Sequence, residues 1–163
     1  MWTSFLNKNT ALVVFLSSLF FIFSCKQIDV YEKNTVFHKH EFHCKDTVQG
    51  SFVIADTNAY YNLYIIVRHT DQYKYNNIWL NVGLKPPTDT FSFQRLQLTL
   101  GDDANGWEGT GMNDIWEARK LINGIPRRFK RPGKYEYCLV NIMRDDPLLH
   151  VMSIGLRMER VSR

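Results

Sequence analysis

Apolar and polar residues alternate with a period of two along most of the chain after residue 35, and turn residues separate the alternating runs. Successive side chains of a β-strand point to opposite faces of its sheet, so this pattern predicts strands with one buried face. The clearest run is Leu149–Arg160, whose even-numbered residues from Met152 to Met158 share one apolar face. The predicted strands are Val36–Cys44, Val48–Ala55, Tyr60–Thr70, Asn77–Leu84, Thr90–Leu100, Ile115–Ile122, Tyr135–Met143 and Leu149–Arg160.

Two of these runs are irregular. In Thr90–Leu100 the apolar phase shifts after Phe93, which indicates a bulge near Gln94-Arg95. Ile115–Ile122 is compatible with a strand or with one short helix. A series of short strands without a clear helix is typical of a β-sandwich or a barrel. We predict an all-β fold, a single antiparallel β-sandwich of about eight strands with a jelly-roll-like arrangement.

The N-terminal segment has a different pattern. Residues 1–24 carry one charge, Lys8, followed by an apolar stretch of 13 residues from Ala11 to Phe23. This stretch is shorter than the roughly 20 residues of a membrane-spanning helix and fits the apolar region of a secretory signal. Ile22-Phe23-Ser24-Cys25 is similar to a bacterial lipobox, in which the cysteine is acylated after cleavage. An uncleaved anchor helix and an ordinary secreted protein are the alternatives.

These features divide the chain into three parts. We predict a lipoprotein signal peptide over residues 1–24, a lipidated tether over 25–34 and the sandwich domain over 35–163. Loss of Lys8 with the signal reduces the net charge from +4 to about +3, which is too mild to indicate a partner. Acyl chains on Cys25 would hold the domain stably at a bilayer.

Cysteine usage leaves two thiols after acylation of Cys25, namely Cys44 and Cys138. In an oxidising envelope compartment an even number permits a disulfide. The bond would close a long loop and contribute about 3–5 kcal/mol on the chain-entropy model. Two separate buried thiols are an equally good interpretation of the sequence.

Two short motifs resemble metal sites. His38 and His40 would share a face of a strand, a spacing that suits zinc, but no second pair supplies the remaining ligands. The segment from Asp102-Asp103 to Gly106 resembles a calcium loop, but Trp107 breaks the alternation of oxygen ligands. Asp, Asn and Gly each suit a tight turn, and we expect a turn and no metal or other cofactor.

The sequence contains none of the common enzyme templates. There is no G-x-S-x-G, H-E-x-x-H, P-loop or dinucleotide fingerprint, so we expect a protein that is not an enzyme. Exposed aromatic rings beside Asp and Asn side chains can bind sugars by stacking and hydrogen bonding. The residues that could form such a surface are Tyr73, Tyr75, Trp79, Asp102, Asp103, Trp107 and Trp116, unless these aromatic rings simply fill the core.

The basic run Arg127-Arg128-Phe129-Lys130-Arg131 can attract anionic lipid or polysaccharide, or form a solvated loop. We expect no nucleic-acid partner for a protein of the cell envelope.

Four segments resemble, in the same order, the GldH family of gliding-motility lipoproteins from Bacteroidetes. They are "SCKQIDVYEKN", "YYNLYIIVRHTDQYKYNNIWLNV", "GDDANGWEGTGMNDIWE" and "PGKYEYCLVNIMRDDPLLHVMSIGLRMER". The resemblance implies a lipid-anchored envelope protein required for gliding, in the outer membrane and facing the periplasm. It also implies other gliding-motility envelope proteins as partners, a link to type IX secretion, and no catalytic residue.

Two functions therefore compete. In the first, a tethered sandwich interacts with gliding components through an exposed apolar patch that includes Tyr73, Tyr75 and Trp79. In the second, the domain binds peptidoglycan or exopolysaccharide through Trp107, Trp116, Asp102 and Asp103.

Overall fold

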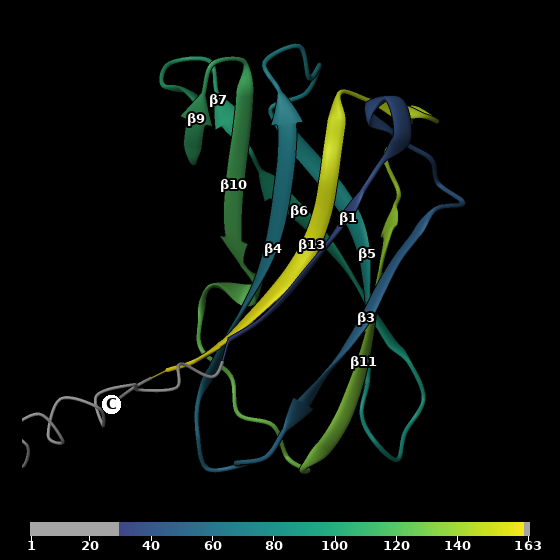
Figure 1. The fold of residues 1–163 in the computed structure, drawn as a ribbon, viewed down its shortest axis with the longest axis vertical. Helices are drawn as coiled ribbons and strands as arrows, with labels where there is room; N and C mark the ends of the chain where they lie inside the picture. Colours follow the sequence, from purple (N-terminus) through teal and green to yellow (C-terminus); the bar gives the residue numbers. More distant parts are fainter. Residues whose placement is uncertain (1–29, 162–163) are drawn as a thin grey trace, which may run out of the picture.

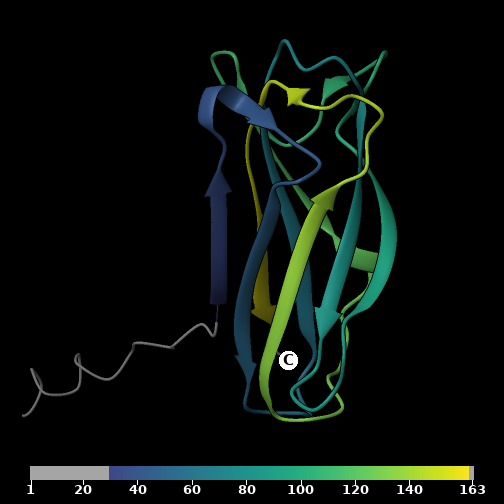
Figure 2. The ribbon, with the colours of Figure 1, turned by 90° about the vertical axis from the view of Figure 1, so that its right-hand side faces the viewer.

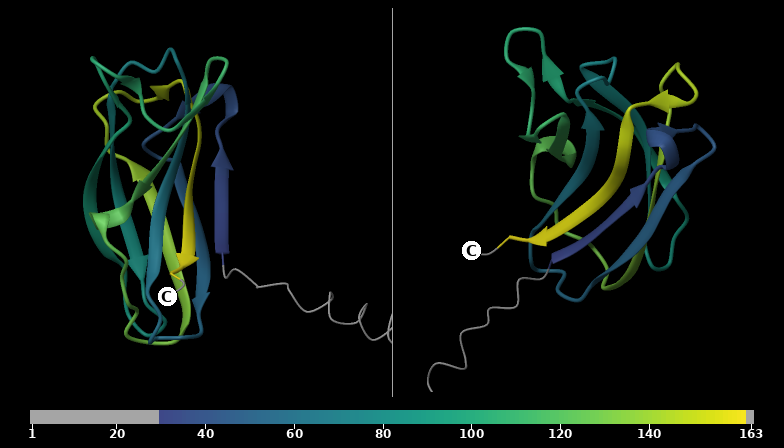
Figure 3. Two further views of the ribbon diagram at one scale, coloured as in Figure 1. Left: turned by 90° about the vertical axis from the view of Figure 1, so that its left-hand side faces the viewer. Right: turned by 45° about the horizontal axis from the view of Figure 1, so that its top comes forward.

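The computed structural model describes residues 30–161, and their strands form two antiparallel sheets that pack face to face (Figure 1). One sheet consists, in spatial order, of β1 (Val30–Val36), β13 (Val151–Arg160), β4 (Tyr61–Thr70), β10 (Ile115–Leu121) and β9 (Thr110–Met112). The other consists of β3 (Thr47–Ile54), β11 (Gly133–Asn141), β5 (Asn77–Lys85) and β6 (Ser92–Thr99). The two layers are seen edge-on in Figure 2 and in the left view of Figure 3.

Short elements complete the ends of the sandwich. The pairs are β2 (Glu41–Phe42) with β12 (Leu148–Leu149), and β7 (Gly101–Asp102) with β8 (Gly106–Trp107). Single 3-10 turns, η2 (His38–His40) and η3 (Ile122–Gly124), follow β1 and β10. Within the described residues, eight strands are seven or more residues long. The prediction of an all-β antiparallel sandwich is confirmed.

The core lies between the two sheets and follows the period-two pattern. Ile154, Leu156 and Met158 of β13 are at most 5% exposed and pair with the inward-facing residues of β4. Opposite them, alternate residues of β5 and β11 such as Leu80 and Leu139 are fully buried. Each strand thus supplies one apolar face, which is the pattern that the alternation in the sequence predicts.

The first strand differs from the prediction. It begins at Val30, six residues before the predicted start at Val36, so residues 30–34 form a strand where a tether was expected. β1 is an edge strand that pairs with β13 alone, and Tyr31 attaches it to the core through a ring contact of 6.0 Å with Phe52. Its other residues are mostly polar, so the sequence does not show the alternation of apolar and polar residues that predicts a strand. The predicted signal peptide and Cys25 lie outside the described residues.

The predicted strand Val36–Cys44 is wrong for its central part. The chain turns at η2, where Lys39 and His40 adopt left-handed backbone angles with φ of 55° and 58°. His38 and His40 therefore do not share a strand face, and the geometry that suggested a zinc pair is not formed.

The predicted bulge near Gln94-Arg95 is also wrong, because β5 and β6 pair without a register shift. Phe93 points to the solvent side of β6, where Gly83 leaves room for its ring, while Leu96 and Leu98 point inward. Apolar residues on both faces of an edge strand produced the apparent phase change. A register shift occurs instead in β13, between Val151 and Ser153.

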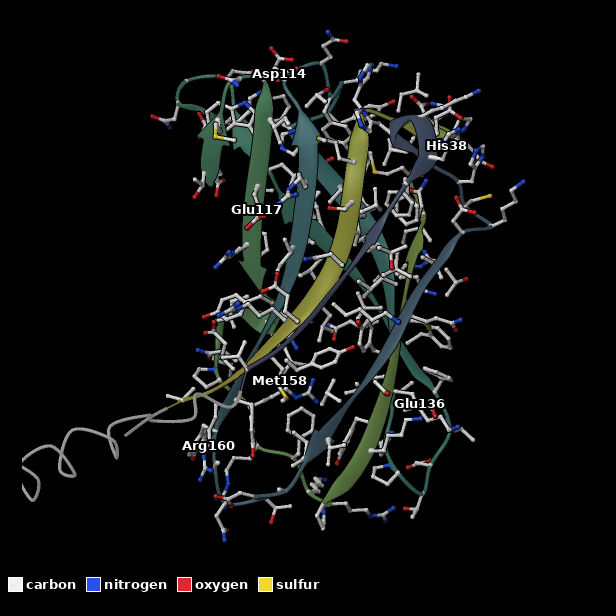
Figure 4. The ribbon with its side chains drawn as sticks, viewed as in Figure 1. His38, Asp114, Glu117, Glu136, Met158 and Arg160 are labelled. Atoms are coloured by element: carbon white, nitrogen blue, oxygen red, sulfur yellow. The ribbon has the colours of Figure 1, made fainter. Side chains whose placement is uncertain are left out.

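The sandwich has two distinct ends (Figure 4). We call the end that carries η2 and the connecting segments 71–76, 102–105, 113–114 and 142–150 the loop end; His38 and Asp114 mark it in the figure. We call the opposite end, where β1 begins, β13 ends at Arg160 and segment 125–132 crosses, the basic end.

Candidate functional site

Most of the candidate residues from the sequence lie at the loop end, where backbone hydrogen bonds hold neighbouring segments together. The amide of Asp71 donates to the carbonyl of Asp114 at 2.8 Å, and the amide of Leu100 donates to the carbonyl of Asn76 at 2.7 Å. The amide of Thr70 donates to the carbonyl of His150 at 3.0 Å. The segments therefore form a fixed surface on which side chains from distant parts of the sequence meet.

Tyr73 is part of the core and not of an exposed patch. Its side chain is 3% exposed, and its hydroxyl donates to the carbonyl of Asn77 at 2.9 Å. Burial raises the pKa of Tyr73. The expectation that Tyr73 belongs to an exposed patch is wrong, because segment 71–76 folds back over the end of the core.

Beneath this segment lies a buried histidine that sequence reasoning missed. His69 is fully buried, with its ring 4.6 Å from that of Trp107 and 5.4 Å from that of Tyr73. Its Nδ1 is 2.9 Å from the carbonyl oxygen of Thr70, so Nδ1 carries the proton and Nε2 is left without a partner. Burial lowers the pKa of His69. Its position in phase with the inward-facing residues of Tyr60–Thr70 was the available signal.

Tyr75 lies in a polar groove at the surface. Its hydroxyl donates to Oδ2 of Asp145 at 2.5 Å, and Nζ of Lys74 is 3.5 Å from the same oxygen. The hydrogen bond from Tyr75, assisted by Lys74, lowers the pKa of Asp145. The groove has a volume of about 610 Å³ and also involves Gln72 and His150. It offers a carboxylate, an ammonium group and an aromatic ring to a polar ligand or a protein segment.

Trp79 is exposed on the outer face of β5, beside the groove. Its side chain is 39% exposed, and its carbonyl accepts a hydrogen bond from the amide of Ile142, itself 37% exposed. Its amide contacts Sδ of Met143 at 3.2 Å. The exposed apolar surface at this place is therefore formed by Trp79 with Ile142, whereas the sequence had suggested Trp79 with Tyr73 and Tyr75.

The residues proposed for glycan binding do not form one exposed platform. Trp107 is half-buried and faces His69, and Trp116 lies against Gly111 of β9. Asp102 accepts hydrogen bonds from the amides of Ala104 and Asn105 at 2.8 and 2.6 Å.

The Asp102 segment is the tight turn that its composition suggested. Hydrogen bonds from Asn105, reinforced by the amide of Ala104, lower the pKa of Asp102, whereas Asp103 is simply exposed. In residues 30–161, no three His, Cys, Asp or Glu side chains come together in a way that would hold a metal ion.

Cys44 and Cys138 are separate free thiols in the structure. Cys44 is exposed at the loop end, and its Sγ donates to Oδ2 of Asp146 at 2.8 Å, which raises the pKa of the thiol. Cys138 lies in the middle of β11 against Gly83, and burial raises its pKa. The structure therefore shows unpaired thiols, but the alternative from the sequence had both thiols buried, and only Cys138 is.

Comparison with known proteins gives a consistent result along the chain. The family model described as GldH lipoprotein matches residues 29–158. The chain is 25% identical over 154 residues to "Gliding motility lipoprotein GldH homolog" of Christiangramia forsetii, a match that covers 90% of this chain and 93% of that protein. It is 24% identical over 165 residues to "Gliding motility lipoprotein GldH" of Flavobacterium johnsoniae, covering 94% of this chain and 97% of the relative.

One solved structure, the VP2 subviral particle of infectious bursal disease virus, shares 15% sequence identity with a TM-score of 0.34. That match covers 82% of this chain and 33% of the viral chain, and at this score it supports no inference. Between residues 30 and 161, no helix has the length and apolar character to cross a membrane.

Proposed function

The chain belongs to the GldH lipoprotein family, and we propose that it acts in the cell envelope as a lipid-anchored, non-catalytic interaction component of the gliding machinery linked to type IX secretion. The observation that carries this proposal is the family match, which extends over both sheets of the sandwich. Both curated relatives carry gliding motility in their names and match along nearly their whole length.

We propose that the anchor is a lipid on Cys25, exposed as the first residue when cleavage removes residues 1–24. Cys25→Ser should abolish incorporation of labelled palmitate and release the protein from membranes. The matched control is Cys44→Ser, which changes an exposed thiol of the folded domain and should leave labelling intact. Continued labelling of the Cys25→Ser protein would refute the anchor.

The proposed contact surface consists of Trp79 and Ile142 together with the adjoining groove of Tyr75 and Asp145. Aromatic residues in partly exposed apolar patches are typical anchors of protein interfaces. The Tyr75–Asp145 hydrogen bond orients these two groups before a partner binds, which reduces the ordering that binding requires.

Chemical cross-linking in intact gliding cells, followed by mass spectrometry of the purified complexes, tests this surface. We expect cross-links to gliding or secretion components that decrease in Trp79→Ala and Tyr75→Ala. Met112→Ala is the control, because Met112 is 73% exposed on the other sheet, away from the groove. Equal cross-linking in all variants would refute the surface.

Glycan binding is the alternative, favoured by the polar groove beside Tyr75 and by the outer membrane location we infer, facing the periplasm. Titration of the domain with envelope glycans, followed by tryptophan fluorescence, distinguishes the two, since Trp79 lies beside this groove. Saturable quenching that Tyr75→Ala removes would favour a glycan-binding module. Fluorescence unchanged by every envelope glycan would exclude it.

A further inference from the structure

The basic run 127–131 lies at the same end of the sandwich as the first residue of β1. Val30 pairs with Glu159 of β13, the neighbouring Arg160 pairs with Tyr61, and Tyr61 forms a bridge with Arg127. Three steps between neighbouring backbones, each of about 4.8 Å, therefore separate Val30 from Arg127 by about 14 Å. Figure 1 shows the end of β13 and segment 125–132 together at this end.

A buried aromatic residue fixes the run in place. Phe129 is 3% exposed, and its ring lies 4.8 Å from that of Tyr135 and 5.6 Å from that of Tyr61. The hydroxyl of Tyr135 donates to the carbonyl of Arg131 at 2.9 Å, and Arg127 exchanges two backbone hydrogen bonds of 2.9 Å with Tyr61. The run is thus attached to the core at its start, middle and end. The side chains of Arg128, Lys130 and Arg131 are exposed, whereas that of Arg127 is exposed only in part and also lies against core residues such as Leu63.

The four basic side chains of this run are not neutralised. Arg127, Arg128, Lys130 and Arg131 are all at least partly exposed, and within residues 30–161 none of them forms an ion pair with a carboxylate.

Arg128 and Arg131 form hydrogen bonds with neutral groups instead. The guanidinium of Arg128 donates to Oδ1 of Asn58 at 2.9 Å, and that of Arg131 donates to the hydroxyl of Thr88. Two other basic residues nearby do have a carboxylate partner, because Lys85 and Lys134 both form ion pairs with Glu136. The run therefore carries a local charge of about +4.

The four basic residues line one depression in the surface. It has a volume of about 360 Å³ and is also lined by Phe129 and Tyr135, and by one carboxylate, that of Asp89. Several guanidinium and ammonium groups around one depression suit a phosphate group, which accepts several charge-assisted hydrogen bonds at once.

We propose that the basic end is a second membrane contact, at which Arg127, Arg128, Lys130 and Arg131 bind the phosphate groups of anionic phospholipids. The inference rests on the lipid anchor at Cys25. Four residues lie between Cys25 and Val30, so the five steps of an extended chain place the anchor at most about 18 Å from β1. The basic end is therefore held near the headgroup layer. There the lipid anchor and the basic residues both increase the affinity of the protein for the membrane. The sandwich then stands on the membrane with its loop end outward.

Binding of the unacylated protein to vesicles tests this surface separately from the anchor. The mature-length chain, residues 25–163 with Cys25→Ser, retains every described residue and lacks the lipid. Its co-sedimentation is measured with vesicles of phosphatidylcholine alone and with vesicles containing about one third phosphatidylglycerol. We expect binding to the anionic vesicles only, with a marked decrease at high salt.

Neutralising substitutions locate the site. Each basic residue near an anionic surface contributes about a fivefold increase in partition, so Lys130→Gln/Arg131→Gln should lower partition about twenty-five-fold. The matched control is Lys45→Gln/Arg144→Gln, which removes one lysine and one arginine from the exposed surface of the loop end. It should leave partition unchanged.

Three results would overturn the proposal: equal binding to neutral and anionic vesicles, equal loss in the two double variants, or binding of an anionic polysaccharide with none of the anionic vesicles. Circular dichroism and urea unfolding of each variant verify that its fold is retained. None of these results depends on palmitate labelling or on gliding partners. A negative result would therefore refute the second membrane contact without refuting the proposed function.

Discussion

Phe129→Ala tests whether the basic run is held by the core. The ring is 3% exposed and packs edge-to-face against Phe52, Tyr61 and Tyr135, with centroids 5.7, 5.6 and 4.8 Å away. Removing a buried phenyl ring costs about 3–5 kcal/mol, because its transfer free energy and its aromatic contacts are lost and a cavity remains. Since domains of this size are stable by about 5–15 kcal/mol, the loss is a large fraction of the total.

Urea unfolding of the mature-length Cys25→Ser chain, followed by circular dichroism, measures the effect. We expect a lower midpoint with an unchanged dependence on urea, because the surface exposed on unfolding is nearly the same. Phe91→Ala is the matched control: Phe91 is 38% exposed, and its ring contacts the exposed Phe93 and the ammonium group of Lys85, so its loss should be below about 1 kcal/mol. If both variants lose equal stability, segment 125–132 is not attached to the core in the way described.

Three further predictions concern the interior and the thiols. Gly83→Ala should destabilise the protein by about 1–3 kcal/mol, because the added Cβ would lie 2.6 Å from Sγ of Cys138; urea unfolding should show a smaller loss when Cys138→Ala is also present. Because burial lowers the pKa of His69, the unfolded chain binds a proton below about pH 6.5 that the folded chain does not, so stability should decrease as the pH falls through this value. His69→Gln should reduce this decrease in urea unfolding at pH values on either side, and an unchanged slope would contradict it. Asp146→Asn should speed the reaction of Cys44 with iodoacetamide at fixed pH, because Asp146 raises the pKa of the thiol, whereas the rate at the buried Cys138 should not change.

The fold was largely predictable because it follows from a local pattern. A strand that packs one face against the opposite sheet shows a clear alternation of apolar and polar residues. The strand predicted over Tyr60–Thr70 therefore differs from β4 by one residue. The pattern fails at the edges. β1 contributes little more than Tyr31 to the core, and β6 carries apolar side chains on both faces, so neither has the simple alternation of a half-buried strand.

The candidate site was less predictable because it depends on how loops return to the core. Tyr73 and Tyr75 are two residues apart in the same polar segment, yet Tyr73 is buried and Tyr75 is half-buried in a groove. The hydroxyl of Tyr73 donates to the carbonyl of Asn77, whereas the hydroxyl of Tyr75 donates to Asp145, 70 residues further along the chain. The Asp145 contact joins distant parts of the chain, and the alternation in the sequence does not distinguish the two tyrosines.

The two proposed surfaces place a geometric constraint on any partner. β4 runs from the basic end to the loop end over ten residues, which span about 33 Å at 3.3 Å per residue. If Cys25 and the basic end are at the headgroup layer, Trp79 and the Tyr75 groove lie about that far from the membrane. A partner at this height must itself extend from the membrane or belong to the periplasmic part of the machinery. Cross-links from the loop end should therefore reach such partners, whereas cross-links from Lys130 should reach lipid and proteins embedded in the same membrane.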